Sequence, residues 1–568
     1  MTAAPDRPTD SAPATPAAPP SLLRDLRDAL RGTEHDYTTG PIGRAILLLA
    51  VPMVLEMSME SIFAVADAFY VGRLGPAAVA TIGLVESLMI VVYTVAMGLG
   101  IGLTATVARR IGEKDHDGAA RTTVQGLLLG AALSSLLGIG GAVAAPDLLR
   151  LMGADDAVLA VGTGFARITL AGNASVFLLF LVNAAFRGAG DAAVAMRALI
   201  LGNGINIALA PLLIFGPGPL PALGIEGAAI ATIVGRSVGF LWALRRLARG
   251  FGNLRVHRTH LRLEPGTMAQ IATLSGWGTL QVALASMSWI GLVRLVATFG
   301  ADAVAGYTIA IRILLFALMP AYGIGAAAST MVGQALGAER PERAEQAVWV
   351  AARINVVVLG LVGVLFWIGA PTFVGWFTES ETVRAVGVAG LRTMSLGFPL
   401  YAIGMVLEQS FNGAGDTRTP TAINAVAFWL VQIPLAWWLS QHTPMGPRGV
   451  FTAVPIACHQ LHHVPTGRLE ASARVMIPLR RCWSFTETTS MSASGVHPAM
   501  QAHAKALDVS EMFDDIAPMG DMRMVTSVVR IVDADDVRPA RRRRTTATTS
   551  RAGHVSGRME LLRTDRRR

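Results

Sequence analysis

The stretch Phe186-Arg-Gly-Ala-Gly-Asp191 recurs as Phe411-Asn-Gly-Ala-Gly-Asp416, 225 residues further along the chain. The two copies differ only at their second residue. The same offset relates further pairs of positions: Gly75 and Gly300, Gly98 and Gly323, Gly112 and Gly337, Pro146 and Pro371, and Gly224 and Gly449. One constant offset at so many points indicates that the chain consists of two homologous halves.

The composition places both halves in a membrane. Of the 568 residues, 52% are hydrophobic and only 15% are charged, whereas about 25% are charged in soluble domains. Apolar runs such as 45–66 and 127–145 have the length of a spanning helix, which is about 17–25 residues. We expect spans at 43–68, 78–103, 119–145, 158–186, 192–215, 224–247, 268–298, 303–333, 345–370, 383–411 and 418–440, with a twelfth beginning near Gly449.

The predicted fold is an all-α polytopic membrane protein. Because each repeat contains six helices, an even number, the second half enters the membrane in the same direction as the first. The halves should therefore form two six-helix bundles, residues 41–250 and 268–457, related as parallel repeats. A basic cytoplasmic linker, 251–267, should join them, and residues 1–40 should form a disordered cytoplasmic N-terminus rich in Pro, Ala and Thr.

The second repeat is incomplete at its end. The match to the first half stops at about Ala457, so the twelfth helix is expected to be truncated. Residues 458–568 form a polar, basic tail without another apolar run, and we expect this tail to be disordered. Two interpretations of the tail remain open: a native extension, or translation of a GC-rich gene out of frame.

The positive charges indicate orientation. The net charge is +9, and arginines are concentrated in the loops on the side of the N-terminus, above all in 245–262. By the positive-inside rule that side is cytoplasmic, which predicts a multi-pass protein of the bacterial cytoplasmic (inner) membrane. Since these loops account for the basic charge, no nucleic-acid partner is expected. The only cysteines, Cys458 and Cys482, indicate no disulfide framework.

Three acidic residues lie inside the first predicted span. Glu56, Glu60 and Asp67 point within about 40° of one another on a helix. Ionisable groups within a span are costly and mark candidate functional sites. We interpret Asp67 as a site for a coupling proton or cation. Glu56 and Glu60 could share that role, or could pair with arginines and accept hydrogen bonds between helices.

Two further acids are candidates of the same kind. Glu86 lies in the second predicted span, where it could face Glu60 or sit near the outer surface. Glu408 lies in the tenth span, at the repeat position of Asn183. Both are possible additional acids of a central cleft.

Asparagines in the fourth and fifth spans could complete a polar pocket or bond neighbouring helices; they are Asn173, Asn183, Asn203 and Asn206. The spans contain no Ser-His-Asp set, metal-ligand spacing or redox motif. No Gly-Lys-Ser/Thr follows the Gly-Ala-Gly-Asp stretches, which argues against a nucleotide site. We therefore expect no enzymatic activity, no catalytic residue, no cofactor and no resident metal.

Several segments resemble the MATE family, the multidrug and toxic compound extrusion transporters, and in particular its DinF-like branch. The segments that carry the resemblance are Asp67-Ala-Phe-Tyr-Val-Gly-Arg-Leu-Gly75, Phe186-Arg-Gly-Ala-Gly-Asp191, Asn206-Ile-Ala-Leu-Ala-Pro211 and Phe411-Asn-Gly-Ala-Gly-Asp-Thr-Arg-Thr-Pro420. The resemblance covers roughly residues 41–457. It implies twelve helices in two bundles around a V-shaped cleft, and antiport of a proton or sodium ion against an organic, often cationic, drug.

The resemblance also implies roles for single residues. The first-helix aspartate of the family maps onto Asp67, and polar residues of its N-terminal lobe map onto Asn183 and Asn206, so that a sodium ion could bind these three. DinF-like members often carry a second aspartate four residues after the fifth-helix asparagine. Ala210 stands there in this chain, so Glu56 or Glu60 would have to supply a second acid.

The predicted function is secondary active efflux: antiport of a proton or sodium ion against small, drug-like, organic and mainly cationic compounds, by alternating access. One alternative is a flippase for lipid-linked precursors from the same superfamily, which would favour arginines in its cleft, such as Arg294 and Arg312. Another is a membrane scaffold or receptor without transport activity. The expected partners are the transported compound and membrane lipids, with a monomeric chain. The substrate and the coupling ion stay open.

Overall fold

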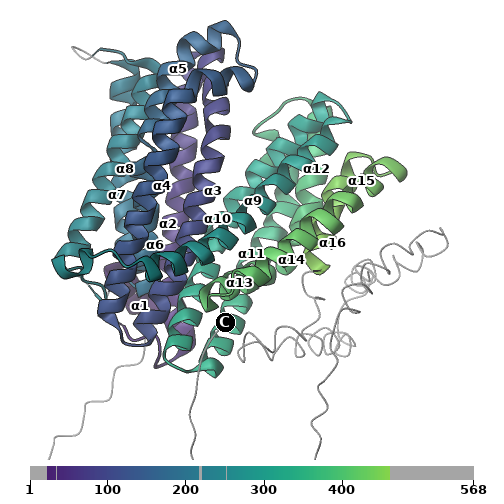
Figure 1. Ribbon diagram of the computed structural model, residues 1–568. Coiled ribbons are helices and arrows are strands. Elements are labelled where there is room, and N and C mark those ends of the chain that lie inside the picture. The colour runs from purple at the N-terminus through teal and green to yellow at the C-terminus, as the bar shows by residue number, and fades with distance from the viewer. Residues whose placement is uncertain (1–21, 33–34, 217–220, 251, 461–568) are drawn as a thin grey trace, which may run out of the picture. The chain divides into compact units, whose positions relative to one another are not determined.

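A computed structural model of the chain describes residues 22–32, 35–216, 221–250 and 252–460. The first half contains α1 (Leu22–Arg31), α2 (Ile42–Val71), η1 (Gly72–Leu74), α3 (Pro76–Gly112), α4 (His116–Leu151), α5 (Asp156–Ala171), α6 (Asn173–Ala189), α7 (Ala192–Phe215) and α8 (Gly224–Arg249). The second contains η2 (Arg258–Leu261), α9 (Pro265–Ala297), α10 (Ala301–Gly337), α11 (Pro341–Gly375), α12 (Glu381–Leu396), α13 (Phe398–Ala414), α14 (Arg418–Asn424), the π-helical η3 (Ala425–Gln432), α15 (Ile433–His442) and α16 (Pro447–Gln460). Figure 1 shows them in chain order.

The helices confirm the predicted membrane protein. Among the described residues, ten helices are long and apolar enough to cross a membrane, or eleven if the bent pair α12 and α13 counts as one span. Their bounds agree with the predicted spans to within a few residues, except that each helix next to the basic loops runs on beyond the apolar stretch. In α3, for example, helix continues to Gly112, nine residues past the predicted end, because helix formation does not require an apolar environment.

Two predicted spans, 158–186 and 383–411, are not continuous helices. The first is divided into α5 and α6 at Gly172, and the second into α12 and α13 at Gly397, with a bend of 58° between α12 and α13. The two glycines are repeat-related. A Cβ on Gly172 would lie 2.1 Å from Ile233, and one on Gly397 would lie 2.8 Å from Pro455. Each break thus lets a neighbouring helix approach the backbone closely, as glycine permits.

The twelfth helix begins where it was expected. It is α16, of 14 residues, and its start at Pro447 lies two residues before the predicted Gly449. Its described length is shorter than the about 20 residues that a span requires. It packs against α12, α13 and α15. The remainder of the predicted tail, residues 461–568, lies outside the described residues.

The expectation of disorder up to residue 40 is wrong for part of that segment. Residues 22–31 form α1, which packs against α2 and α7. Asp25 is buried and accepts a hydrogen bond from Arg44 Nε at 2.9 Å, and Arg197 donates to the Leu30 carbonyl at 2.6 Å. The polar composition of this segment predicted disorder, because the contacts that hold the helix in place are mainly charged ones, in addition to the buried Ala29. Residues 1–21 lie outside the described part of the chain.

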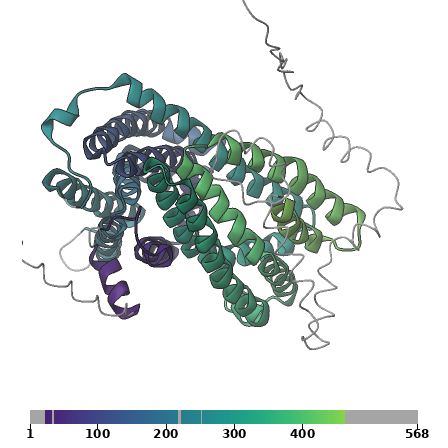
Figure 2. The same cartoon turned by 90° about the horizontal axis from the view of Figure 1, so that it is seen from below.

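The two halves meet through repeat-related helices. α3 packs against α9, and α10, the repeat counterpart of α3, packs against α2, the counterpart of α9. Figure 2 shows the same helices from below. The contacts concentrate toward the end of the helices that carries the basic loops 113–115 and 338–340, which we call the basic end. Buried residues 45–53 of α2 there share one apolar cluster with residues 324–335 of α10.

Glycines allow the helices to approach closely at this interface, and these glycines occupy repeat-related positions. A Cβ on Gly98 would lie 2.4 Å from the Thr279 backbone nitrogen, and a Cβ on Gly323 would lie 2.8 Å from the backbone nitrogen of Val54. Val54 and Thr279 are themselves 225 positions apart. The contact is therefore a self-complementary one about a pseudo-twofold axis, in which each half presents the same groove and the same ridge to the other. Small residues allow such close helix approach in membranes.

A segment that precedes α2 joins both halves at the basic end. Residues 35–40, which we call the strap, lie between α1 and α2. Arg343 at the start of α11 donates to three strap carbonyls, those of Tyr37, Thr39 and Gly40, at 2.7–2.8 Å. Arg340 donates to the Thr38 carbonyl at 2.7 Å. The second half thus holds four carbonyls of the strap.

The strap is also attached to the first half. Tyr37 donates from its hydroxyl to the Gly190 carbonyl at 3.3 Å, and Lys114 pairs with Asp36 at 3.1 Å. Partial burial acts to raise the pKa of Asp36, but hydrogen bonds from Thr38 and the charge of Lys114 outweigh it, so that the pKa lies below its usual value. Asp36 is therefore charged at neutral pH, and the strap connects the two halves by both hydrogen bonds and an ion pair.

We expect Arg343→Gln to loosen the strap. The replacement removes charged donors from the three carbonyls, and backbone amides of residues 35–40 should exchange hydrogen about tenfold faster or more. Hydrogen–deuterium exchange followed by mass spectrometry measures this. Arg353→Gln is the control, because Arg353 is an exposed arginine of the same helix. Unchanged exchange in the Arg343 variant would show that the arginine does not hold the strap.

Candidate functional site

Asp67 lies near the end of α2 that is remote from the basic loops. Its side chain is partly buried, and its Oδ1 atom is buried without a hydrogen-bond partner. Glu86 of α3 is near enough to act on it electrostatically, and Arg312 of α10 acts in turn on Glu86. Among the described residues Asp67 forms no ion pair. The acid that Glu86 acts on is thus Asp67, and the predicted position of Glu86 facing Glu60 stays a prediction.

Glu56 lies deeper along α2 and is occupied by an arginine. Arg187 of α6 donates from Nη1 to Glu56 Oε1 at 2.6 Å, and the two side chains are only 9% and 3% exposed. Asn183, one turn before Arg187, donates to the same oxygen at 3.4 Å. The second oxygen, Oε2, is buried and accepts no hydrogen bond. Glu56 thus has an arginine partner, as one of its two predicted alternatives requires, and still has one acceptor oxygen without a donor.

Glu60, one turn further along α2, has a second arginine partner. Arg236 of α8 donates to Oε1 at 2.6 Å, and its side chain is 7% exposed. Asn203 of α7 donates to Oε2 at 3.3 Å and also to the Met59 carbonyl at 3.3 Å. The ring of Phe63 lies beneath the guanidinium, with a centroid distance of 4.9 Å. The acidic face of α2 is therefore a row in which two of the three acids are matched by arginines from other helices.

The asparagines do not gather around Asp67. Asn183 lies with Glu56, and Asn206 donates to Thr232 of α8 at 2.9 Å. The described contacts join neither amide to Asp67, so a sodium site made of these three residues stays a prediction. Ala210 is fully buried in the apolar cluster of the first half, which places no second acid on α7 at that position.

The second half contains a buried acid of its own. Glu408 of α13 accepts hydrogen bonds at Oε1 from Gln281 of α9 at 2.5 Å and from Asn424 of α14 at 3.4 Å. Gln281 is the repeat counterpart of Glu56, just as Glu408 is the counterpart of Asn183. Both halves therefore contain one carboxylate facing one amide between the same two helices of the repeat. The acid and the amide have exchanged helices.

The candidate site has an excess of acceptor oxygens. Among the described residues, buried oxygens without a hydrogen-bond donor include Asp67 Oδ1, Glu56 Oε2, Asn183 Oδ1, Asn203 Oδ1 and Gln281 Oε1. A buried polar atom without a partner in a native structure calls for an explanation, such as an ion, a proton or a water molecule. All five atoms accept, so the groups that would satisfy them are donors or cations.

Sequence reasoning missed the arginines. The sequence singled out neither Arg187 nor Arg236 as a partner of the acids, yet both are buried inside the first half. The signal for Arg236 was present, because an arginine within an apolar helix implies a nearby acid. The signal for Gln281 was the repeat offset itself, which maps it onto Glu56.

The comparison with known proteins agrees with this geometry. The model of the family MatE matches residues 52–212 and 279–438, one segment in each half. The chain belongs to the MATE family. It is thus a multi-pass membrane protein of a family of multidrug efflux transporters, and its function is that of a secondary transporter.

Two relatives and one solved structure illustrate the likeness. The chain is 27% identical to the probable multidrug resistance protein YoeA of Bacillus subtilis, covering 73% of this chain and 91% of that protein. It is 25% identical to the FAD transporter of Shewanella oneidensis, covering 74% and 93%. A solved structure, the outward-facing conformation of a multidrug resistance MATE family transporter of the MOP superfamily, is 28% identical, with a TM-score of 0.71 over 75% of this chain and 94% of that one.

Proposed function

We propose that this MATE transporter is an exporter of small organic, mainly cationic compounds, driven by inward movement of a proton or a sodium ion. The observation that carries the proposal is Asp67: it is the acid of α2 that no described arginine neutralises, and its buried oxygen accepts nothing. A carboxylate of this kind gains a partner when a proton or a cation binds. The ion is a transported substrate here, and no cofactor or enzymatic step is required.

The interface between the halves supports alternating access. Their contacts close the basic end, through the glycines of α3 and α10 and through the strap. With the basic loops in the cytoplasm, this closes the transport path toward the cytoplasm and leaves Asp67 on the outer side of the closure. Binding of an outer proton or sodium ion at Asp67 favours the state in which these contacts separate, and the ion is then released inside.

The acidic row also argues against a flippase for lipid-linked precursors. Such a protein would present unpaired arginines to a pyrophosphate group, whereas Arg187 and Arg236 are both matched by glutamates in this chain. Of the arginines that this alternative relied on, Arg312 acts on the acid Glu86 and Arg294 is exposed. A scaffold or receptor would not need the unpartnered acid. The branch within the family and the monomeric state stay predictions.

The test is drug-triggered ion movement in proteoliposomes. A pH-sensitive dye reports dissipation of a proton gradient, with and without sodium, as cationic drugs are added. We expect wild-type protein to respond and Asp67→Asn to lose the response by about tenfold or more, because the amide cannot take up the coupling charge. In a second set of proteoliposomes a sodium-sensitive dye reports the sodium gradient; drug-triggered sodium movement without any change of the proton gradient would identify sodium as the coupling ion.

Asp147→Asn is the matched control for the transport assay. Asp147 lies at the outer end of α4 and its side chain is 78% exposed, so the same chemical change should leave export intact. Size-exclusion elution and thermal unfolding establish that both variants are folded. An Asp67→Asn variant that moves ions as fast as the wild type would contradict the proposal.

A further inference from the structure

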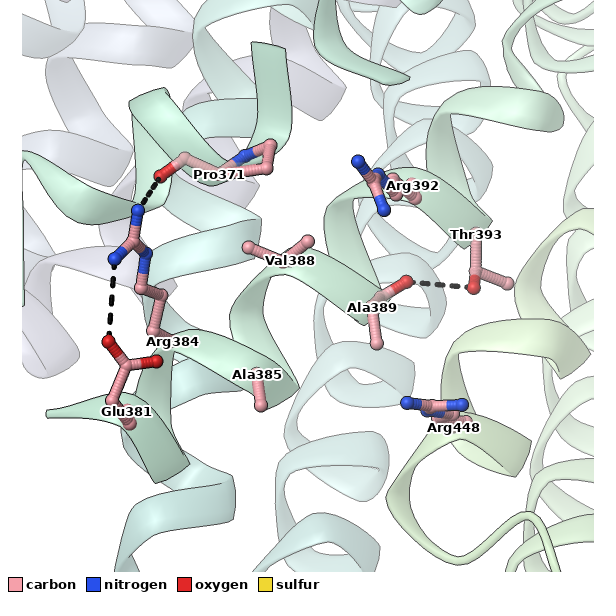
Figure 3. Close-up of a pocket in the computed structure, with 9 residues that line it drawn as sticks. All are labelled: Pro371, Glu381, Arg384, Ala385, Val388, Ala389, Arg392, Thr393 and Arg448. Atoms are coloured by element: carbon pink, nitrogen blue, oxygen red, sulfur yellow. Dashed lines mark hydrogen bonds and ion pairs between the residues drawn. The ribbon is translucent and has the colours of Figure 1, made fainter. Parts of the chain in front are cut away.

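A basic pocket opens at the end of the second half opposite the basic loops. It is a depression of about 470 Å³ between α11, α12 and the start of α16. Figure 3 shows Arg384 on one side of it, with Glu381 and Pro371, and Arg392 and Arg448 on the other. Neither the acids of α2 nor Glu408 line this pocket, so it is separate from the candidate coupling site.

The charges of this pocket are not balanced. Arg384 pairs with Glu381 at 3.5 Å, but the glutamate side chain is 85% exposed, and the arginine also donates to the Pro371 carbonyl at 3.3 Å. Arg392 donates from Nε to the Trp367 carbonyl at 3.1 Å. Among the described residues, neither Arg392 nor Arg448 forms an ion pair with a carboxylate. Three guanidinium groups therefore share one pocket with a single, solvent-facing acid.

Exposed aromatic side chains place the pocket at the membrane surface. Trp376 and Phe377, at the end of α11, are 71% and 54% exposed. Tryptophan is enriched at the level of the lipid headgroups. Trp367, whose carbonyl binds Arg392, lies nine residues earlier on α11, which is about 13 Å deeper along a helix. Arg392 thus lies deeper in the membrane than Trp376. Apolar side chains near it in the sequence or beside Trp367 are exposed and would face lipid: Ile368 is 66% exposed and Leu396 is 54% exposed.

We propose that this pocket binds the phosphate group of an anionic phospholipid from the outer leaflet. A phosphate has the oxygens that guanidinium groups bind in a bidentate manner. On the cytoplasmic side of membranes, basic pockets between helices bind anionic headgroups through the same chemistry. The lipid tails would lie along the exposed apolar side chains of α11 and α12. A free phosphate ion shares the chemistry of the headgroup but would gain nothing from this apolar surface.

The test is native mass spectrometry of the full chain, titrated in detergent with phosphatidylglycerol. We expect the double variant Arg392→Gln/Arg448→Gln to bind the first phosphatidylglycerol molecule about tenfold more weakly, or weaker, than wild type. Arg150→Gln is the matched control, since Arg150 is an arginine of the same membrane side in the other half. Binding of phosphatidylcholine should be equal in all three proteins. Equal affinity for phosphatidylglycerol in wild type and double variant would overturn the proposal.

Two further measurements test whether the bound group is a lipid and whether the arginines bind it. Inorganic phosphate at a large excess should not displace the lipid; displacement would reassign the site to a soluble phosphate and overturn the lipid assignment. If the double variant does not fold, Arg448→Gln alone replaces it, because Arg448 is exposed at the first turn of α16. That variant should still weaken phosphatidylglycerol binding by several-fold, and no change would count against the proposal.

Discussion

Replacing Arg187 with leucine should destabilise the protein by about 3–5 kcal/mol, the cost of leaving a buried charge without its partner. Arg187 and Glu56 are almost completely buried, and their side chains approach to 2.6 Å. Without the guanidinium, Glu56 would have only the 3.4 Å bond from Asn183. Thermal unfolding in detergent, monitored by size exclusion, measures the change as a large fall in the midpoint temperature.

The double variant Glu56→Gln/Arg187→Leu should recover most of that loss. Removing both charges also removes the uncompensated carboxylate, so the two replacements should be strongly non-additive. Arg353→Leu, at an exposed position of α11, is the control and should change stability by about 0.5 kcal/mol or less. If the single and double variants were equally unstable, the pair would not be coupled and the buried contact would have no energetic significance.

Adding one methyl group at Gly98 should disable transport. The Cβ of Gly98→Ala would lie 2.4 Å from the Thr279 backbone nitrogen, a contact that a rigid helix backbone cannot relieve without moving away. Overpacking of this kind costs about 1–3 kcal/mol, here against the arrangement in which the basic end is closed. The ratio of molecules whose basic end is open to those whose basic end is closed should rise by about tenfold or more. Export in proteoliposomes should fall accordingly.

Cysteine labelling reports the same shift directly. Thr106 is 7% exposed at the basic end of α3, so Thr106→Cys, in a chain whose Cys458 and Cys482 are replaced by serine, should react slowly with an impermeant maleimide. Adding Gly98→Ala should accelerate the reaction. Gly83→Ala on the same helix is the control, because its Cβ would meet nothing within 4 Å. Labelling that is equally slow in both backgrounds would show that the glycine contact does not control closure.

The sequence was sufficient for the spans, the repeat and the family, because each depends on local hydropathy or on a recurring motif. The face shared by Glu56 and Glu60 was also predictable from helix geometry. Their partners were not, since Arg187 and Arg236 come from helices whose rotation about their own axes is set by packing. The docking of α1 was missed for a related reason: its contacts to Arg44 and Arg197 are charged and distant in sequence, and local composition does not report them.

The exchanged acid and amide have a consequence for how the two halves diverged. If the halves descend from one duplicated unit, then Glu56 with Asn183 in one and Gln281 with Glu408 in the other are two outcomes of the same ancestral contact. Both halves have kept a contact between one carboxylate and one amide. The residue type at each of the two positions has changed. Residue-by-residue comparison of the halves would find an acid lost and another gained, whereas comparison of contacts finds a single inherited feature present in both.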